Sequence, residues 1–559
     1  MNPVRFVRSN RSPILVAIVT ALLAAHTAAF GADPNGFPVC TAAGDQMLPV
    51  VVPDGTGGVI IAWLDRRPTV AADGVCFAQR VNAQGVPQWA AGGVQLSTSG
   101  DVNPPVIVAD GAGGAYVAFG GDASRARVQW VNASGVIQWG ADGSSLTTAS
   151  SAKRDLAIAR DVGGAGGAIV GWREVNGLGG LSDIYAQKVN AAGAIQWAGD
   201  GTPVIATNMN SETLPALASD GGGGAFFIWL GSNGARAQRL NSAGATQWNT
   251  TPLSGASNNR VPAIAPDGAG GMVAAWAGGG TLGTFAQRVD ASGNKLWNPP
   301  NTGIQLSTGG NQITMIPDGV GGGIFVWQEN RVGTNFNLYA QKLNGSGALQ
   351  WLATGAEVCV APAEQFGPMI VPDGGTGAII TWYDLRSGMT AADIYAQRID
   401  AAGASQWTTD GNPLCVVANP QEFPTIASDA AGGAFVVWED FRSGSNEDIY
   451  ASHIGPGGAV LDVPSDGGEP SISGPWPHPF TDQVQLALVL PGAMPVGLDV
   501  FDVNGRRVRS LGSRALEAGP HRFTWDGRLD DGGSAKSGIY FLRVSGPGLS
   551  LIRSVVRLR

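Results

Sequence analysis

Four acidic residues are each followed two positions later by an arginine, and each stands two positions after a Trp. The pairs are Asp65 with Arg67, Glu329 with Arg331, Asp384 with Arg386, and Asp440 with Arg442. Two carboxylates placed around one sugar can act as acid and base in glycoside cleavage, and guanidinium groups bind polar ligands through paired hydrogen bonds. These eight residues are therefore our candidate ligand-binding sector, with a polar molecule such as a glycan as its ligand.

The same residues also permit a structural interpretation. Arg386 could bond Asp393, and Arg442 could bond Asp448, across their own hairpins as surface ion pairs worth about 0.2–1 kcal/mol each. The acids recur with a repeat, as structural residues do, whereas catalytic carboxylates should be unique to single units. We therefore assign no catalytic residue and favour a non-enzymatic protein, with a glycoside hydrolase or lyase as the alternative.

Histidines and glycine-rich turns indicate no cofactor and no metal. Only His453, His478 and His521 follow residue 31, and His453 occupies a strand position that other repeat copies give to Arg or Lys. A catalytic triad or a histidine-rich metal site has too few ligands here. The glycine-rich turns lack the Lys-Ser/Thr of a phosphate loop, so no nucleotide site is predicted.

The four cysteines are predicted to be buried free thiols. Cys40, Cys359 and Cys415 occupy the same place in three copies of a Val/Leu-Cys strand, and Cys76 stands apart from them. An exported protein favours disulfides. Equivalent positions of different units, however, lie too far apart for a bond between two sulfur atoms.

An eightfold repeat must position these residues. Each copy has an Asp-Gly-type turn followed, usually nine residues after the Asp, by an aromatic residue. The copies are Asp54 with Trp63, Asp110 with Phe119, Asp161 with Trp172, Asp220 with Trp229, Asp267 with Trp276, Asp318 with Trp327, Asp373 with Trp382, and Asp429 with Trp438. Successive Asp residues lie 47 to 59 positions apart, the length of one four-stranded unit that must stack on its neighbours.

Each unit reads as four short antiparallel strands. Around Trp382, β-branched and aromatic runs at 368–373, 378–386, 393–400 and 411–416 are separated by turn residues. The third strand is followed by an Asn/Asp-x-x-Gly hairpin and then a second Trp. The pattern predicts that both aromatic residues pack between neighbouring blades rather than bind a ligand.

The eighth unit lacks its last strand, and the missing piece stands at the other end of the chain. Within the eighth unit, no Trp and no Val-Cys strand come after His453, but Gly36–Cys40 precedes the first Asp-Gly turn and matches the strands at Cys359 and Cys415. We therefore predict an all-β fold in which residues 32–461 form an eight-bladed β-propeller, closed by its N-terminal strand.

The N-terminal segment predicts export. Arg5, Arg8 and Arg11 precede an apolar run at 14–30, which is typical of a signal peptide spanning 1–31. No second long apolar stretch follows, so no membrane span is expected in the mature chain, which should be secreted or attached to the outer-membrane surface. The net charge of -9 argues against a nucleic-acid partner.

The tail from 471 to 559 follows a polar linker at 462–470 and has a different pattern. Its ordered motifs include Pro477-His-Pro-Phe480, Asp502-Val-Asn-Gly-Arg506, Phe523-Thr-Trp525-Asp-Gly and Ser537-Gly-Ile-Tyr540. They closely resemble the FlgD-like immunoglobulin-type domain and the related type A sorting domain of type IX secretion, with His478 where the family usually has Asn. The resemblance implies a small β-sandwich whose partner is the type IX secretion machinery.

The repeat itself resembles propellers known for other roles. Phe285–Trp297 is similar to the repeat of quinoprotein-type propellers, but nothing matches their quinone and calcium residues. The sequence as a whole predicts a cell-surface binding or adhesion module delivered by its C-terminal domain. The alternative is a carbohydrate-active enzyme. A third possibility, a flagellar assembly factor, follows from the tail alone and conflicts with the predicted signal peptide.

Overall fold

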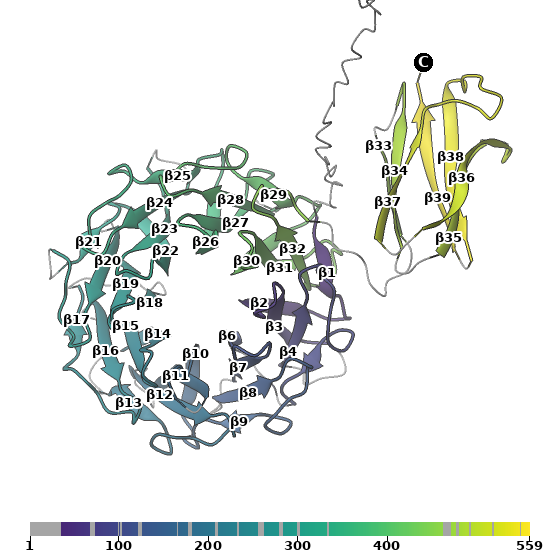
Figure 1. The fold of residues 1–559 in the computed structure, drawn as a ribbon. Helices are drawn as coiled ribbons and strands as arrows, with labels where there is room; N and C mark the ends of the chain where they lie inside the picture. The colour runs from purple at the N-terminus through teal and green to yellow at the C-terminus, as the bar shows by residue number, and fades with distance from the viewer. Residues whose placement is uncertain are drawn as a thin grey trace, which may run out of the picture. The chain divides into compact units, whose positions relative to one another are not determined.

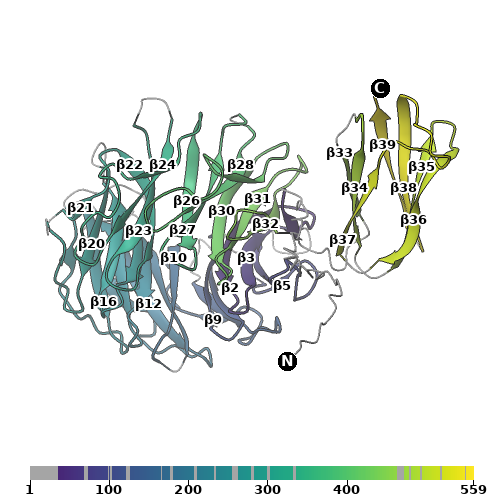
Figure 2. The same ribbon diagram turned by 45° about the horizontal axis from the view of Figure 1, so that its top comes forward.

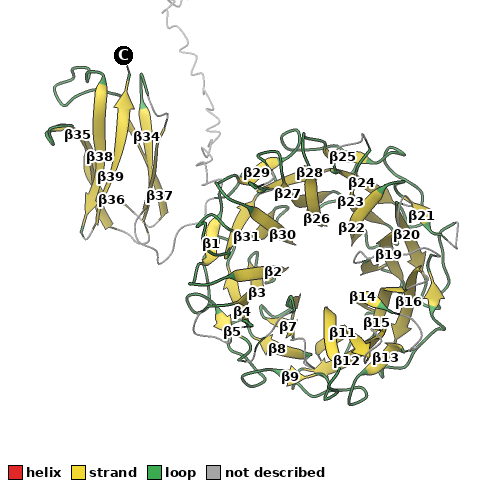
Figure 3. Ribbon diagram, turned by 180° about the vertical axis from the view of Figure 1, so that it is seen from behind, coloured by secondary structure: helices red, strands yellow, loops and turns green. Residues whose placement is uncertain are grey.

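The structure is a computed structural model of the whole chain. It describes residues 35–67, 73–98, 100, 103–120, 126–164, 166–176, 181–206, 211–231, 234–254, 262–278, 283–298, 302–331, 335–388, 390–461, 471–476, 480–490, 494–516, 519–547 and 549–558. The predicted signal peptide at 1–31 and linker at 462–470 lie outside these residues. Within them there is no helix, and hence none long and apolar enough to cross a membrane (Figure 3).

Eight four-stranded antiparallel sheets make up the repeat region. Sheets one to four contain β2 (Gln46–Pro53), β3 (Val59–Asp65), β4 (Val75–Val81), β5 (Val94–Gln95); β6 (Val106–Ala109), β7 (Ala115–Phe119), β8 (Arg127–Val131), β9 (Ser144–Ser145); β10 (Ala152–Arg160), β11 (Gly167–Asn176), β12 (Leu181–Asn190), β13 (Thr202–Ile205); β14 (Thr213–Ser219), β15 (Ala225–Gly231), β16 (Gly234–Leu240) and β17 (Thr251–Pro252).

Sheets five to eight continue the same order of strands. They contain β18 (Ala263–Pro266), β19 (Met272–Ala277), β20 (Thr284–Val289), β21 (Ile304–Gln305); β22 (Gly310–Pro317), β23 (Gly323–Glu329), β24 (Asn337–Leu343), β25 (Ala356–Cys359); β26 (Gln365–Pro372), β27 (Ala378–Asp384), β28 (Asp393–Ile399), β29 (Asn412–Cys415); β30 (Gln421–Ser428), β31 (Ala434–Asp440), β32 (Asp448–Ile454) and β1 (Phe37–Cys40). The N-terminal strand therefore completes the eighth sheet, as predicted.

The sheets stand side by side around a central opening in a propeller-like arrangement (Figure 1). The first strand of each sheet contacts the first strand of the next, and β30 of sheet eight contacts β2 of sheet one. These first strands line the opening (Figure 2). Each second strand is covered on both faces by neighbouring sheets, which explains why β3 is buried along its whole length.

The turn and the first aromatic residue of each repeat have the roles that the sequence predicted. Asp54 Oδ1 accepts hydrogen bonds from the backbone N–H groups of Thr56 (2.7 Å) and Gly58 (2.9 Å), so the carboxylate caps the turn. The first Trp is fully buried in the seven sheets that have it: Trp63, Trp172, Trp229, Trp276, Trp327, Trp382 and Trp438. These Trp residues form the packing between sheets.

The N-terminal segment fits sheet eight as the fourth strand fits the other sheets. Gly411 has φ +92°, and a Cβ atom there would lie 2.5 Å from the Trp382 ring. Gly36 has φ +73°, and its Cβ would lie 2.3 Å from the Trp438 ring. Because only glycine allows both the backbone conformation and this close approach, the two segments make the same contact.

Neighbouring sheets are tied by the second Trp of each unit. Its indole N–H donates to a hairpin carbonyl of the following sheet at 2.9 to 3.1 Å. The seven bonds run from Trp89 to Ala133, Trp139 to Ala191, Trp197 to Ser242, Trp248 to Ala291, Trp297 to Gly345, Trp351 to Ala401, and Trp407 to Pro456. They connect each of sheets one to seven with the next.

The C-terminal region consists of two further sheets around one core. One sheet has the order β33 (Ser471–Trp476), β34 (Val484–Leu490), β37 (Gly519–Trp525), and the other has β36 (Arg507–Leu516), β35 (Met494–Asp502), β38 (Gly538–Gly546), β39 (Leu549–Arg557). Trp525 packs on Phe480 and Tyr540, with Val500 and Leu542 in the same cluster. The region is β-rich, as predicted.

Candidate functional site

The acid and arginine of each predicted pair bind one another. In sheet seven, Arg386 Nε lies 2.9 Å from Asp384 Oδ1, and Nη2 lies 2.7 Å from Oδ2. The pairs in sheets one and eight have the same fork, and in sheet six Arg331 contacts Glu329 through Oε2. The backbone N–H of Arg386 also donates to Asp384 at 2.9 Å, so the two-residue spacing itself closes the pair.

The expected partners across the hairpin were wrong. Asp393 accepts a hydrogen bond from Ser387 Oγ, and Asp448 accepts one from Asn446 Nδ2 at 2.9 Å. The pairs are also not at the surface, because the Asp384 side chain is 0% exposed and that of Arg386 is 23% exposed. Arg386 thus binds the acid two residues before it in the chain and not the acid on the opposite strand.

A buried indole explains why an acid stands at this position. Trp382 Nε1 donates to Asp384 Oδ2 at 2.9 Å, and the same bond occurs in sheets one, six and eight. In sheet three Glu174 accepts from Trp172, and in sheet four Glu212 accepts from Trp229 at 2.7 Å. Glu212 escaped the sequence pattern because it precedes the first strand instead of following the Trp.

The guanidinium groups are enclosed as well. Each lies over an aromatic ring of the third strand in its own sheet, at 3.4 to 3.9 Å from the ring centroid. Arg386 Nη2 also donates to the carbonyl of Asp410 at 2.9 Å and lies 3.3 Å from Sγ of Cys359, which belongs to sheet six. These contacts tie one sheet to its neighbour.

The cysteines are buried thiols, as predicted, and form no disulfide in the part of the chain that the structure describes. Burial raises the pKa of Cys40 to about 11 and those of Cys359 and Cys415 to about 12. The thiols therefore stay protonated and are poor nucleophiles.

The candidate sector forms one arc but not one site. Its residues belong to sheets six, seven, eight and one, whose first strands follow one another in contact. Each carboxylate is nevertheless enclosed by its own Trp and Arg. The geometry therefore favours a role as hydrogen-bond acceptor within the fold over a role as catalytic acid or base. Ligand binding by the sector stays a prediction. A ligand would contact the outer edges of the guanidinium groups.

A second set of residues, next to this sector, is present in six of the eight sheets and varies among them. A residue near the start of the first strand faces the residue directly after the first Trp of the second strand, and we call these two residues a bulge pair. The bulge pairs are Met47 with Leu64, Arg154 with Arg173, Thr213 with Leu230, Asn311 with Gln328, Phe366 with Tyr383, and Glu422 with Glu439. One register position thus carries apolar, basic, amide, aromatic and acidic side chains.

Each bulge pair is followed by a bulge with a left-handed residue. These residues are Leu48 (φ 56°), Asp155 (φ 50°), Leu214 (φ 52°), Gln312 (φ 49°), Gly367 (φ 60°) and Phe423 (φ 51°). Five of the six are not glycine, and such a conformation costs about 1–3 kcal/mol. Bulges re-aim neighbouring side chains and gather next to functional sites, so this ring of bulges marks a candidate binding face.

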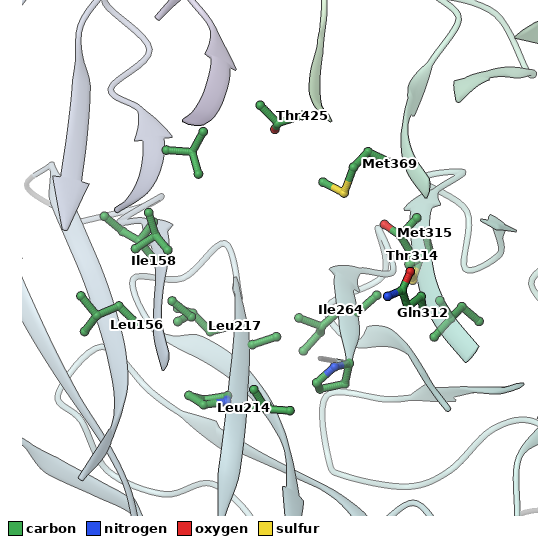
Figure 4. A pocket seen from close by; sticks show the side chains of 18 of the residues that line it. Leu156, Ile158, Leu214, Leu217, Ile264, Gln312, Thr314, Met315, Met369 and Thr425 are labelled. Carbon is green, nitrogen blue, oxygen red and sulfur yellow. The ribbon is translucent and has the colours of Figure 1, made fainter. Parts of the chain in front are cut away.

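The bulges border the central cavity, which has a volume of about 820 Å³. Equivalent positions of all eight first strands line it: Val50, Val106, Ala157, Ala216, Ala263, Thr314, Met369 and Thr425. Figure 4 shows Leu214, Gln312 and Met369 around the same space. Among the described lining residues none is charged, so the cavity suits an uncharged or apolar group.

Sheet eight places three glutamates around a smaller cavity of about 210 Å³. Glu422, Glu439 and Glu447 line it together with Pro420 and Phe441. Burial raises the pKa of Glu439 to about 7 and also raises those of Glu422 and Glu447. None of these glutamates recurs at the equivalent position of other sheets. Only this departure from the repeat could have indicated them in the sequence.

An aromatic row leads from sheet six to this acidic cavity. The ring centroids of Phe336 and Phe366 lie 6.0 Å apart, those of Phe366 and Tyr383 5.6 Å, and those of Tyr383 and Phe423 5.8 Å. Phe423 is 53% exposed. The row crosses two junctions between sheets, and no spacing rule in the sequence predicted it.

Comparison with known proteins identifies one region by sequence. Residues 479–548 match the family described as the FlgD Ig-like domain. A segment of 67 residues is 40% identical to the basal-body rod modification protein FlgD of Escherichia coli (strain K12), over 12% of this chain and 27% of that protein. The chain thus spans about a quarter of the relative, and the prediction of a FlgD-like domain is confirmed.

The solved structures similar to this chain are distant from it. The BP39L lectin of Burkholderia pseudomallei has 10% identity and a TM-score of 0.42, and covers 75% of this chain and 99% of its own. The Dos1 propeller has 10% identity and a TM-score of 0.39, over 73% and 92% of the two chains. At these scores the similarities carry no argument about function.

Proposed function

We propose that the chain is an exported, non-enzymatic binding module built on a closed eight-bladed β-propeller, with the bulge pairs as its recognition face. The observation that carries this proposal is the contrast between neighbouring positions. An acid that binds the first Trp recurs in six sheets, whereas the residue directly after that Trp varies among them from Leu to Arg, Gln, Tyr and Glu. A buried acid such as Glu439 destabilises the fold, and a ligand accounts for it.

An array experiment tests this proposal directly. Full-length protein is applied to glycan and peptide arrays beside a variant with Glu422→Gln and Phe423→Ala, and beside Glu357→Gln, an exposed acid of β25, as the matched control. We expect a set of bound ligands that the double variant loses and the control keeps. Binding that is identical in all three proteins would refute the bulge pairs as the recognition face.

The eight residues of the candidate sector are proposed as a second contact for the same ligand. The Arg67, Arg331, Arg386 and Arg442 side chains are between 19% and 25% exposed. Replacing all four by Lys keeps their charge and removes their forks. Lost ligand binding at an unchanged melting temperature would support this contact, and lost stability with intact binding would assign the arginines to structure alone.

The delivery of the module is proposed from the two ends of the chain. The signal peptide at 1–31 would start export, and the domain at 471–559 would be recognised by the type IX secretion machinery and leave the propeller at the cell surface. The FlgD Ig-like match at 479–548 supports this role. A secreted reporter fused to residues 465–559 should reach the surface only in a host that has this machinery.

A carbohydrate-active enzyme is the second candidate, and the acidic cavity favours it. Glu439, whose pKa is raised to about 7 by burial, shares that cavity with Glu422 and Glu447, and a carboxyl group with such a pKa can act as a general acid. Incubation of the protein with the bound glycans decides between the candidates. Product release that Glu439→Gln abolishes would establish the enzyme, and intact glycans would leave a binding module.

A further inference from the structure

The arc of sheets six to eight presents hydrogen-bond acceptors at one of its ends. Gln328 is 2% exposed, and its Oε1 atom, like Asn311 Oδ1, is buried without a hydrogen-bond donor in the described structure. These two residues form the bulge pair of sheet six. A buried acceptor without a donor is costly, so this end of the arc is complementary to a group that carries N–H donors.

The other end of the arc presents negative charge without a free counter-ion. Glu422 faces Glu439 across β30 and β31, and Glu447 lies beside them. Glu439 Oε1 accepts one hydrogen bond, from the Leu48 N–H at 2.6 Å. Among the described residues no ion pair includes these glutamates: Arg442 binds Asp440, and the charge of Arg66 lowers the pKa of Glu447 less than burial raises it.

Aromatic rings fill the space between these two ends. The row from Phe366 through Tyr383 to Phe423 joins the amide pair of sheet six to the acidic pair of sheet eight. A guanidinium group stacks on aromatic faces and forks onto carboxylates in one geometry, which an ammonium group does not. The three chemistries along the arc are therefore those that recognise an arginine side chain.

We propose that this arc binds an extended peptide segment containing arginine, whose guanidinium stacks on Phe423 and donates hydrogen bonds to Glu422. This inference rests on the proposed binding function and names its ligand. The residues beside arginine in such a segment reach the uncharged cavity at Met369 and Thr425. The net charge of -9 favours the approach of a cationic partner.

The test compares two peptides of nearly the same shape, of which only one has the charged guanidinium group and its full set of N–H donors. Fluorescence anisotropy measures binding of labelled Ala-Arg-Ala-Arg-Ala and of the same peptide with neutral citrulline in place of arginine, using the full-length protein. We expect the arginine peptide to bind about tenfold more tightly. Glu422→Gln should remove that preference, Phe423→Ala should weaken binding about fivefold, and Glu357→Gln should change neither.

The pH dependence adds an independent readout. Deprotonation of Glu439, beside Glu422 and Glu447, increases the negative charge of the arc while the guanidinium stays charged. Affinity for the arginine peptide should therefore rise between pH 6 and pH 8, and affinity for the citrulline peptide should stay constant.

Equal affinity for both peptides, or an arginine preference that survives Glu422→Gln, would overturn the inference. Glycans that bind the native protein and not Phe423→Ala would leave the proposed function standing and make the ligand a sugar. If neither peptides nor glycans bound in a way that depends on the bulge pairs, the inference and the proposed function would both fall.

Discussion

The junction between sheets eight and one differs from the seven junctions between consecutive sheets. At those seven, a Trp indole donates to a hairpin carbonyl of the next sheet. Sheet eight has no second Trp in the sequence, and His453 Nδ1 lies 3.1 Å from the Ala83 carbonyl while Nε2 lies 2.9 Å from Asp429. This junction thus lacks the indole bond and keeps only a side-chain contact to the hairpin carbonyl like the one that Arg80 makes to Ala133.

Further polar contacts belong to the same junction. Glu439 Oε1 accepts from the Leu48 N–H, and the Gln46 N–H donates to the Glu447 carbonyl at 2.7 Å. The eight-to-one junction has a buried apolar core that includes Trp63 and Phe435, but it lacks the indole bond and includes Glu439, a buried group whose pKa is raised to about 7. The comparison indicates that the two kinds of junction should respond differently to mutation and to pH.

Removal of residues 32–45 should have the largest effect. It deletes β1, which supplies the fourth strand of sheet eight and places Cys40 and Gly36 against sheets one and eight. We expect the melting temperature to fall by roughly 10 °C or more, as followed by circular dichroism. An unchanged melting curve would contradict closure by this strand.

Trp297→Ala should break one of the seven ordinary junctions. Trp297 is 1% exposed and donates to Gly345. Loss of its burial should lower the free energy of unfolding by about 3–5 kcal/mol, as measured in guanidinium chloride. The loss should be the same at pH 5 and pH 8, and a strong pH dependence would mean that the two kinds of junction are not distinct.

Glu439→Gln should change stability in a pH-dependent way. Because the folded-state pKa of Glu439 is raised from 4.5 to about 7, the folded state holds this proton more tightly than the unfolded state. The protonated Glu439 carboxyl therefore contributes about 3 kcal/mol at most to the free energy of unfolding. This contribution is complete below pH 4.5 and is lost as pH rises to 7.

Thermal melts between pH 4.5 and pH 8 measure this effect. The native protein should lose stability over that window relative to Glu439→Gln, and the Trp297→Ala variant should keep the native slope. Parallel curves for the native protein and Glu439→Gln would show that Glu439 does not titrate at this junction.

His453→Phe should have the smallest effect, about 1–2 kcal/mol, because it leaves Asp429 and the Ala83 carbonyl without their partner. Arginine occupies the equivalent position in sheet one, where Arg80 binds Asp54 and the Ala133 carbonyl. His453→Arg should therefore match the native stability in chemical denaturation. Equal losses in both variants would show that the bond across the junction contributes nothing.

Strands and turns were predictable from the sequence where a few residues close together in the chain determine the local structure. The Asp of the turn, the Asn/Asp-x-x-Gly hairpins and the missing strand of the eighth unit depend on local spacing, and Phe37–Cys40 pairs with β32 as expected. The FlgD-like region was identified for the same reason, since its motifs are ordered along one segment.

The candidate site was less predictable because it depends on contacts between units. The sequence offered Arg386 two acids, Asp384 and Asp393, and only the structure shows that its backbone and side chain both bind Asp384. Leu48 and Phe423 adopt left-handed backbone conformations without the glycine that would announce them. The aromatic row joins residues of three sheets. The sequence predicted only the part of the molecule in which it lies, the uneven arc of sheets six, seven, eight and one.

The pairing of β1 with β32 has a consequence for the order in which the protein is made. Phe37 meets Ala451, so β1 cannot form its strand pair until β32 has been synthesised. Seven sheets are complete before this contact can form, and contacts of such separation form late in folding. A chain that stalls before β32 would leave β1 exposed and vulnerable to proteolysis, so quality control could recognise unfinished molecules by their N-terminus.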